Sequence, residues 1–236
     1  MIERIIISND TPKYNPLFDF FKKYEHLKPE RRILELSNTI TSDFGLIGEQ
    51  RTEFIKKWLV GLISSIHGKH SPLMLVLSGR NQNTGKSEFF RRLLPSELMP
   101  YYAESKLDAG KDDEILMTQK ILIMDDEMSG KSKREAAFIK QILSKQTFSL
   151  REPYGRNNID LNRLAVLCGT SNDDGILNDP TGNRRIIPIH VKSIDHDVYN
   201  SINKIDVLME AYWLWHSGYK WELQKSDIQE LNNNTS

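Results

Sequence analysis

The sequence predicts an α/β fold in which a mostly parallel sheet is flanked by helices and preceded by a small helical segment. Short apolar runs at residues 73–77, 121–124, 164–167 and 185–191 have the length of buried strands. Helical periodicity at 86–94 and 132–144 lies between these runs. Strands that alternate with helices are typical of a parallel sheet covered on both faces.

The N-terminal helical segment is expected at residues 15–68. Asn15-Pro16 is a plausible helix start, and apolar residues follow it at helical spacing. A second helix is expected after Pro29, and a third at about 50–67 has a continuous apolar face. The residues from Gly68 to Pro72 end this third helix.

Two regions of the chain are therefore predicted. Residues 1–70 form an N-terminal helical segment, and residues 71–236 form a core that includes a C-terminal helix at about 207–215. The last five residues, 232–236, are polar and are expected to fray.

The composition excludes several classes of protein. The 236 residues carry 32 basic and 32 acidic side chains, which argues against coating nucleic acid by bulk charge but not against a local basic patch. A single cysteine, Cys168, excludes an internal disulfide framework and fits a reducing cytoplasm. No apolar run approaches the roughly 18 residues of a membrane span. We expect a cytoplasmic protein without a signal peptide or a membrane partner.

Residues 78–87 have the pattern of a phosphate-binding loop between a strand and a helix. Gly85 lets the backbone approach phosphate closely, Lys86 would reach the β- and γ-phosphates, and the Ser87 hydroxyl would bind Mg²⁺. Arg80 stands where the usual pattern has its first glycine. The alternative is an ordinary strand–turn–helix with a capping Thr or Ser. The candidate residues for binding ATP are Gly79, Asn83, Thr84, Gly85, Lys86, Ser87 and Glu88.

Three acids, Asp125, Asp126 and Glu127, follow the apolar run at 121–124. One carboxylate at such a strand end can hold the magnesium ion, and a neighbour can orient or deprotonate the attacking water. We expect Asp126 on the metal and Glu127 on the water, with Asp125 as the alternative acid on the metal side. A solvated strand end is the other interpretation.

Polar residues also follow the two later strands. Asn172 ends the run that begins at 164, where its amide could hydrogen-bond the γ-phosphate or the water; otherwise it caps a turn. Arg184 and Arg185 follow a turn and could stabilise the charge of the transferred phosphoryl group, as an arginine finger does. A surface turn whose arginines pair with acids is the alternative, and chemistry alone does not choose between the two arginines.

A basic segment lies between the acidic strand and the strand that ends at Asn172. Its lysines and arginines could contact DNA phosphates, and Tyr154 could stack on a base of single-stranded or forked DNA. A solvated basic helix and loop is an equal alternative. The candidate DNA-binding residues are Lys140, Lys145, Arg151, Tyr154 and Arg156.

The order of these motifs resembles the virulence-associated protein E family, which is related to superfamily 3 helicases and to the primase-helicases of phages and mobile elements. The resemblance covers the chain from about residue 15 to 231. It rests on the motifs at 85–87, 126–127, 151–156, 169–172 and 181–185.

This resemblance implies a P-loop AAA+-like core that forms a ring, usually a hexamer, around DNA, with ATP bound between subunits. Asp126 and Glu127 would form the hydrolytic pair and Asn172 the sensor. Arg184 or Arg185 would reach the neighbour's ATP, and the segment from 145 to 156 would face DNA in the channel. A primase module would have to come from elsewhere.

Three functions remain open from the sequence. The first is an ATP-dependent DNA helicase or translocase of a phage or mobile-element replication protein. The second is a nucleotide-dependent module that binds a partner without unwinding DNA. A small-molecule kinase also needs a phosphate loop but fits poorly, since it would leave Asn172 and the two arginines idle.

Overall fold

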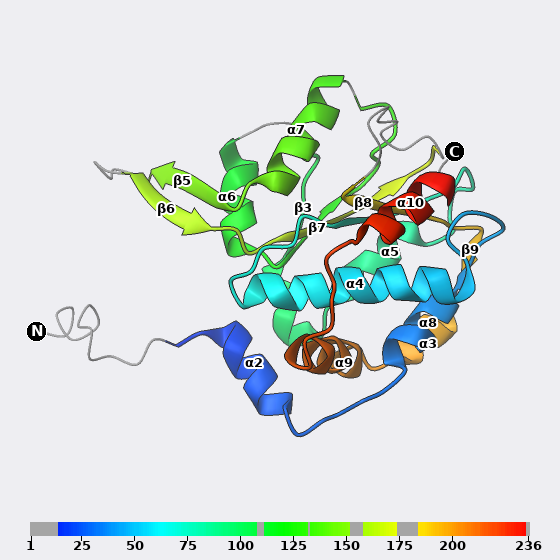
Figure 1. Cartoon of the computed structure of the whole chain (residues 1–236), viewed down its shortest axis with the longest axis horizontal. Coiled ribbons are helices and arrows are strands. Elements are labelled where there is room, and N and C mark those ends of the chain that lie inside the picture. Colours follow the sequence, from blue (N-terminus) through cyan, green and yellow to red (C-terminus); the bar gives the residue numbers. More distant parts are fainter. Residues whose placement is uncertain (1–13, 108–110, 132, 152–157, 174–183, 235–236) are drawn as a thin grey trace, which may run out of the picture.

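A five-stranded parallel sheet forms the centre of the computed structural model, which describes residues 14–107, 111–131, 133–151, 158–173 and 184–234 (Figure 1). Every pair of neighbouring strands in this sheet is parallel, which confirms the predicted fold class. Its order is β3 (Tyr102–Glu104), β4 (Leu122–Asp125), β7 (Val166–Ser171), β2 (Met74–Ser78) and β8 (Ile186–His190).

Helices cover both faces of this sheet, because successive strand residues pack into two different hydrophobic clusters. In β2, Leu75 and Leu77 belong to the cluster formed with α4 (Gly48–Ile66), α5 (Lys86–Arg91) and α9 (Lys204–His216). Met74 and Val76 belong to the cluster formed with α6 (Lys111–Gln119) and α7 (Lys133–Ser144). This alternation is the period of two that a strand buried on both faces requires.

The N-terminal helices pack on the same core as the sheet. In α2 (Pro16–Tyr24), the Asn15 side chain accepts a hydrogen bond from the Leu17 amide at 3.0 Å, as the sequence predicts for a helix start. With α3 (Arg32–Asn38), α2 contributes to the cluster that contains α4 and α9. Trp58 of α4 donates from its indole nitrogen to the carbonyl of Leu167 at 3.0 Å. The division of the chain at residue 70 stays a prediction.

Smaller elements complete the described chain. Within the basic segment, β5 (Thr147–Arg151) pairs antiparallel with β6 (Asn158–Asn162), and the two strands extend away from the body in Figure 1. The sequence patterns did not predict η1 (Ser96–Tyr101), α8 (His196–Ser201), or the pair β1 (Ile40–Thr41) and β9 (Ser193–Ile194).

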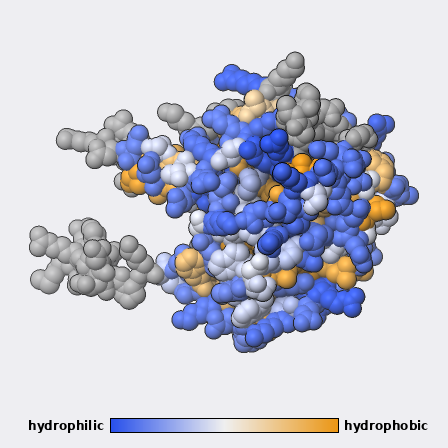
Figure 2. Space-filling view, viewed as in Figure 1, coloured by the Kyte–Doolittle hydropathy of each residue, from blue (hydrophilic) through white to orange (hydrophobic). Residues whose placement is uncertain are grey.

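The C-terminal helix α10 (Lys225–Asn234) includes part of the tail that is expected from its composition to fray. Buried Leu231 attaches it to the core. No helix among the described residues is long and apolar enough to cross a membrane. The face seen in Figure 2 is mainly hydrophilic, with hydrophobic side chains in small groups.

Candidate nucleotide-binding site

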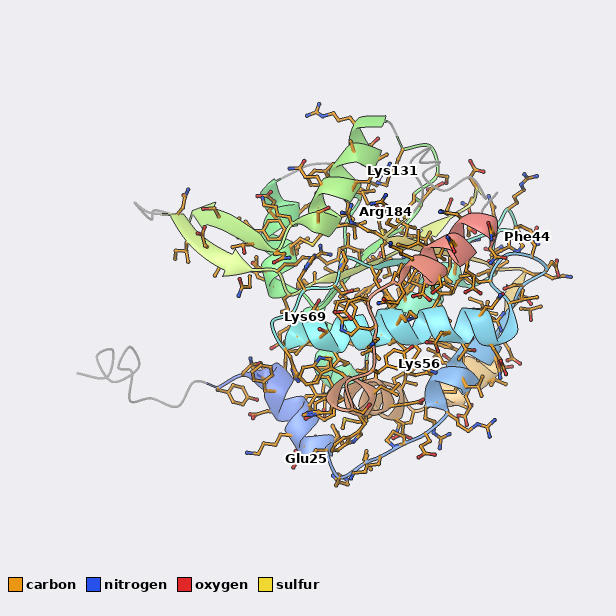
Figure 3. The ribbon with its side chains drawn as sticks, viewed as in Figure 1. Glu25, Phe44, Lys56, Lys69, Lys131 and Arg184 are labelled. Atoms are coloured by element: carbon orange, nitrogen blue, oxygen red, sulfur yellow. The ribbon has the colours of Figure 1, made fainter. Side chains whose placement is uncertain are left out.

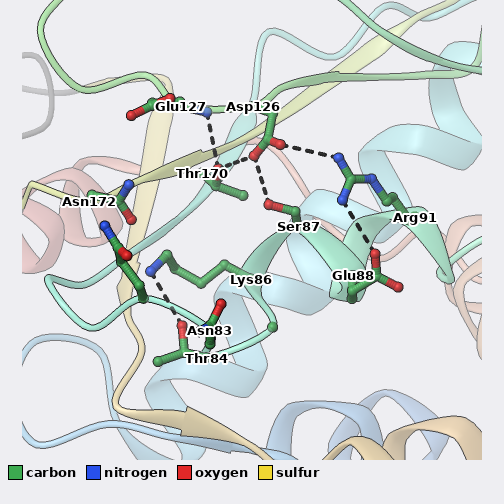
Figure 4. Close-up of a pocket in the computed structure, with 12 residues that line it drawn as sticks. Asn83, Thr84, Lys86, Ser87, Glu88, Arg91, Asp126, Glu127, Thr170 and Asn172 are labelled. Carbon is green, nitrogen blue, oxygen red and sulfur yellow. Dashed lines mark hydrogen bonds and ion pairs between the residues drawn. The ribbon is translucent and has the colours of Figure 1, made fainter.

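A cavity of about 380 Å³ lies at the edge where the central strands end. This volume is within the usual range for small-molecule sites, roughly 300–1,000 Å³. Most of the predicted nucleotide-site residues line it, together with Gln82, Arg91 and Thr170, which were not among the candidate residues (Figure 4). The lining residues are Gln82, Asn83, Thr84, Gly85, Lys86, Ser87, Glu88, Arg91, Asp126, Glu127, Thr170 and Asn172.

Two glycines of the loop after β2 are required by its geometry. Gly85 has φ +80°, and a Cβ atom there would overlap Nε2 of His196. Gly79 has φ +151°, and a Cβ atom there would lie 2.5 Å from the carbonyl oxygen of Val191. Gly79 does not line the cavity itself. It lets the loop leave β2 in close contact with the backbone that follows β8.

The Lys86 ammonium group lies inside this loop. Although charged, Lys86 is only 7% exposed. Its Nζ donates hydrogen bonds to the carbonyls of Gly79 at 2.8 Å and Asn81 at 3.0 Å, and to Oγ1 of Thr84 at 3.3 Å. The loop therefore concentrates a positive charge beside the cavity, which suits an anionic ligand.

Ser87 and Asp126 meet at the floor of the cavity, although 39 residues separate them. The Ser87 hydroxyl donates to Oδ1 of Asp126 at 2.7 Å, and the Thr170 hydroxyl donates to the same oxygen at 2.6 Å. Thr170 Oγ1 also accepts a hydrogen bond from the Glu127 amide at 3.2 Å. Thr170 therefore ties the two predicted acids to β7. In the sequence, Thr170 could have been recognised as a hydroxyl residue two positions before Asn172 in the same predicted strand.

Arg91 closes the same network from the next turn of α5. Its Nη2 lies 3.2 Å from Oδ2 of Asp126, while its Nε and Nη2 bind Glu104 of β3 at 2.8 and 3.1 Å. Its Nη1 lies 3.3 Å from Glu88. Arg91 could have been recognised from the sequence because it follows Ser87 by four residues, a spacing that places both side chains on one face of a helix.

Electrostatics keep Asp126 ionised. Partial burial acts to raise its pKa, but hydrogen bonds from Thr170 and Ser87 and the charge of Arg91 outweigh burial and lower the pKa below its ordinary value. A carboxylate that stays charged at neutral pH is suited to bind a cation.

Asp125 does not reach the cavity. Its carboxyl group is fully buried and forms an ion pair with Lys131 at 2.8 Å. Burial raises its pKa to about 6, against the opposing effect of Lys131. Adjacent residues of an extended chain point to opposite faces, so Asp126 turns towards α5 and Asp125 towards the α6 and α7 side.

Glu127 and Asn172, the two remaining candidates from strand ends, are exposed and line the cavity. Glu127 has φ +71°, a left-handed backbone that is uncommon for a residue with a side chain. This conformation aims its amide at Thr170. Both side chains are accessible to a ligand beside Asp126.

Arg184 and Arg185 lie away from the cavity of their own chain. They come just before β8, and the Arg185 carbonyl accepts a hydrogen bond from the amide of Met74, the first residue of β2. They are therefore at the edge where strands begin, whereas the cavity is at the edge where strands end. Arg184 is exposed and Arg185 half-buried.

Two of the five candidate DNA-binding side chains can be described. Lys145 forms an ion pair with Glu114 at 2.6 Å, and its Nζ lies 4.6 Å from the ring centroid of Phe148. Lys140 is half-buried on α7. The side chains of the other candidates, Arg151, Tyr154 and Arg156, are outside the described residues.

Residues 30–236 match the family model of the virulence-associated protein E-like domain. The chain belongs to this family. The resemblance predicted from the motif order is thereby confirmed, and the match includes every residue that lines the cavity. No curated protein matches the sequence significantly.

Among solved structures, this virulence-associated protein E-like domain is similar to the C-terminal region of NrS-1. An apo structure of its residues 305–718 gives a TM-score of 0.59 at 12% identity, covering 89% of this chain and 53% of that one. A second apo structure gives a TM-score of 0.57 at 13% identity with the same coverage. The chain thus spans about half the length of these structures, and the similarity supports the fold.

Proposed function

We propose that this domain is the ATP-driven DNA helicase or translocase part of a phage or mobile-element replication protein. One observation carries the proposal. A hydroxyl directly after the buried loop lysine, Ser87, meets an ionised carboxylate at the end of a neighbouring strand, Asp126, at 2.7 Å. This is the arrangement that P-loop enzymes use to hold a metal–nucleotide complex. Family membership supports the setting in replication.

Lys86 and the loop amides would bind the β- and γ-phosphates. Mg²⁺ would be held by the Ser87 hydroxyl and the Asp126 carboxylate, with phosphate oxygens and water completing its ligands, since magnesium favours oxygen donors and rarely uses all-protein sites. When bound, the metal neutralises charge on the phosphate oxygens. The hydrogen bond between Ser87 and Asp126 supports this assignment, because the two oxygens lie 2.7 Å apart.

Glu127 would orient or deprotonate the attacking water, and Asn172 would contact the γ-phosphate. Both are exposed into the cavity on the side of Asp126. Thr170 would hold the pair of acids in place through its bonds to Asp126 and to the Glu127 amide. Hydrolysis would then depend on this hydroxyl of β7 as well as on the side chains that follow β2 and β4.

The arginines support a shared site. Arg184 and Arg185 lie at the sheet edge opposite to the cavity, so neither serves the nucleotide of its own chain without a large rearrangement. In a head-to-tail ring, the edge of the sheet where the strands of one subunit begin can face the edge where the strands of the next subunit end. An arginine supplied by the neighbour would then stabilise the charge that develops on the phosphoryl group.

The hairpin of β5 and β6 is the proposed DNA contact. It projects from the body, and every residue of β6 is exposed (Figure 1). Basic residues of this segment would bind DNA phosphates in the channel of the ring. The alternative function, a nucleotide-dependent module that binds a protein partner, uses the same nucleotide site but does not need a basic hairpin.

ATP hydrolysis measured over a range of protein concentrations, with and without single-stranded DNA, tests the proposal. Turnover per chain should rise with both, because the site is completed by a neighbour and coupled to DNA. Turnover indifferent to both would favour the partner-binding module. An absence of hydrolysis under every condition would remove the motor function.

A further inference from the structure

Arg91 has a position that nucleotide binding alone does not explain. Its guanidinium reaches one oxygen of Asp126 at 3.2 Å, while the other oxygen of that carboxylate accepts from Ser87 and Thr170. In Figure 4 the guanidinium lies between Asp126 and Glu88, on the opposite side of the carboxylate from Glu127. Asp126 thus has a fixed positive charge against it before any metal is considered.

A divalent cation and Arg91 compete for the same carboxylate. Both are positive, and each needs oxygen lone pairs of Asp126. Arg91 also has a second carboxylate partner. Glu104 of β3 binds it through two nitrogens, at 2.8 and 3.1 Å, in the paired geometry that arginine and carboxylate favour. Hydrogen bonding to Arg91 correspondingly lowers the pKa of Glu104.

We propose that Arg91 acts as a built-in counter-ion for Asp126, so that it supplies the positive charge of the site when nucleotide binds without metal and yields the carboxylate when Mg²⁺ arrives. This inference rests on the proposed function, because it assigns Mg²⁺ to Asp126. Arg91 is a positioning residue here. Its effect is on how strongly nucleotide binding depends on metal.

The metal dependence of nucleotide affinity is the quantity to measure. We define it as the Kd of a fluorescent, non-hydrolysable ATP analogue in EDTA divided by its Kd in Mg²⁺ at equal ionic strength. Arg91→Met removes a competitor of the metal, which strengthens binding in Mg²⁺, and removes a positive charge, which weakens binding in EDTA. Both effects increase the ratio, and we expect an increase of about tenfold from one charge-assisted contact.

Matched variants separate this role from general damage. Arg92→Met changes the adjacent arginine, which pairs with Glu88 and Asn200 but makes no contact with Asp126, and should leave the ratio unchanged. Arg91→Lys keeps the charge and should restore part of the wild-type ratio. Glu104→Gln should lower the ratio, since Arg91 then holds Asp126 more tightly, and should add little once Arg91 is Met.

The outcomes decide the inference cleanly. A ratio that rises in Arg91→Met and recovers in Arg91→Lys supports it. Equal weakening in EDTA and in Mg²⁺ would reduce Arg91 to a structural contact and overturn the inference while leaving the nucleotide site intact. Failure of the wild-type chain to bind the analogue in Mg²⁺ would instead overturn the proposed function itself.

Discussion

At the scale of single residues, the charged groups of the candidate site already form hydrogen bonds and ion pairs with their neighbours. Lys86 is buried on carbonyls of its own loop, and Asp126 accepts hydrogen bonds from both α5 and β7. Such contacts hold the groups in place before a ligand arrives, which reduces the entropy lost on binding. Predictions at this scale concern one side chain and one measurable equilibrium.

Lys86→Ala should abolish the thermal stabilisation that ATP gives. ATP at a hundredfold excess over Kd stabilises a folded protein by about 2.7 kcal/mol, or roughly 5–10 °C in Tm for a domain of this size. Without the ammonium group in the loop, the shift should fall close to zero. Lys69→Ala is the control, since Lys69 is exposed beyond the end of α4 and pairs with Glu222 (Figure 3). An unchanged shift would remove Lys86 from the site.

Buried Asp125 should make stability depend on pH in an unusual direction. Its folded-state pKa of about 6 is above the ordinary 3.8, so between these values the folded chain holds a proton that the unfolded chain has lost. Its contribution to the free energy of unfolding therefore declines as pH rises from about 4 and is lost above about 6. The difference corresponds to about 3 kcal/mol.

Denaturant unfolding of the wild type and Asp125→Asn from pH 4 to pH 7 measures this contribution. The substitution also unpairs Lys131, which adds a nearly constant offset, so the change of the difference with pH is the informative quantity. The wild type should lose stability relative to the variant as pH rises. Parallel curves would show that the buried carboxyl titrates near its ordinary pKa.

At the scale of elements, the loop after β2 is held between α5 and α8. Gly85 ends the loop against the His196 ring, and Tyr199 of α8 donates from its hydroxyl to the carbonyl of Phe89 in α5. The position of α8, which the sequence did not predict, thus constrains the loop between β2 and α5 from outside. Changes at this contact should affect the loop before they affect the sheet.

Gly85→Ala should destabilise the fold by more than Gly130→Ala. Both glycines have similar positive φ values, +80° and +73°, so both substitutions carry the same backbone strain of about 1–2 kcal/mol. Only the Cβ at 85 also meets another residue, His196, whereas nothing lies within 4 Å at 130. Thermal unfolding of the two variants separates the cost of the backbone strain from the cost of the contact with His196. Equal losses would mean that α8 moves aside freely.

The hairpin provides a second prediction at this scale. Arg151→Ala combined with Arg156→Ala should weaken binding of single-stranded DNA and reduce the slope of log K against log salt by between about one and two, because each lost phosphate contact removes about 0.7. Arg32→Ala with Lys192→Ala is the control, since these two basic residues lie away from the hairpin, Arg32 half-buried in α3 and Lys192 exposed between β8 and β9. An unaltered slope would place the DNA surface elsewhere.

At the scale of the whole molecule, parallel strands give the sheet two unlike edges. The cavity lies where β2, β4 and β7 end, while the arginine pair lies where β8 begins. Within one chain these two positions lie at opposite ends of the strands, whereas in the proposed ring the arginines of one copy could approach the cavity of the next. The quaternary arrangement is therefore testable through complementation between defective subunits.

Mixing two inactive variants should restore ATP hydrolysis. Lys86→Ala subunits keep their arginines, and subunits with Arg184→Ala and Arg185→Ala keep their phosphate loops. In a randomly mixed ring about a quarter of the interfaces would combine an intact loop with an intact arginine pair. Hydrolysis should recover to about that share of wild type if the interfaces act independently. A mixture as inactive as its parts would mean that the arginines serve their own chain.

Much of this architecture is predictable from the order of residues along the chain. The loop around Lys86 is recognisable because Gly-Lys-Ser between an apolar run and a helix has few other uses. The predicted strands agree with the observed ones to within a few residues. The strand predicted to end at Asn172, for example, is β7, which ends at Ser171, where Thr170 and Ser171 pair with Leu77 and Ser78.

The chain by itself determined the residue types of the site and their positions near strand ends, since local patterns of polarity specify both. Only the tertiary structure decided which acid serves the cavity. Asp125 and Asp126 are neighbours in sequence with identical chemistry, but one faces α6 and α7 and is buried with Lys131, while the other faces α5 and meets Ser87. The packing of helices on the two faces makes that choice, and it also brings Arg91 and Thr170 to the same carboxylate.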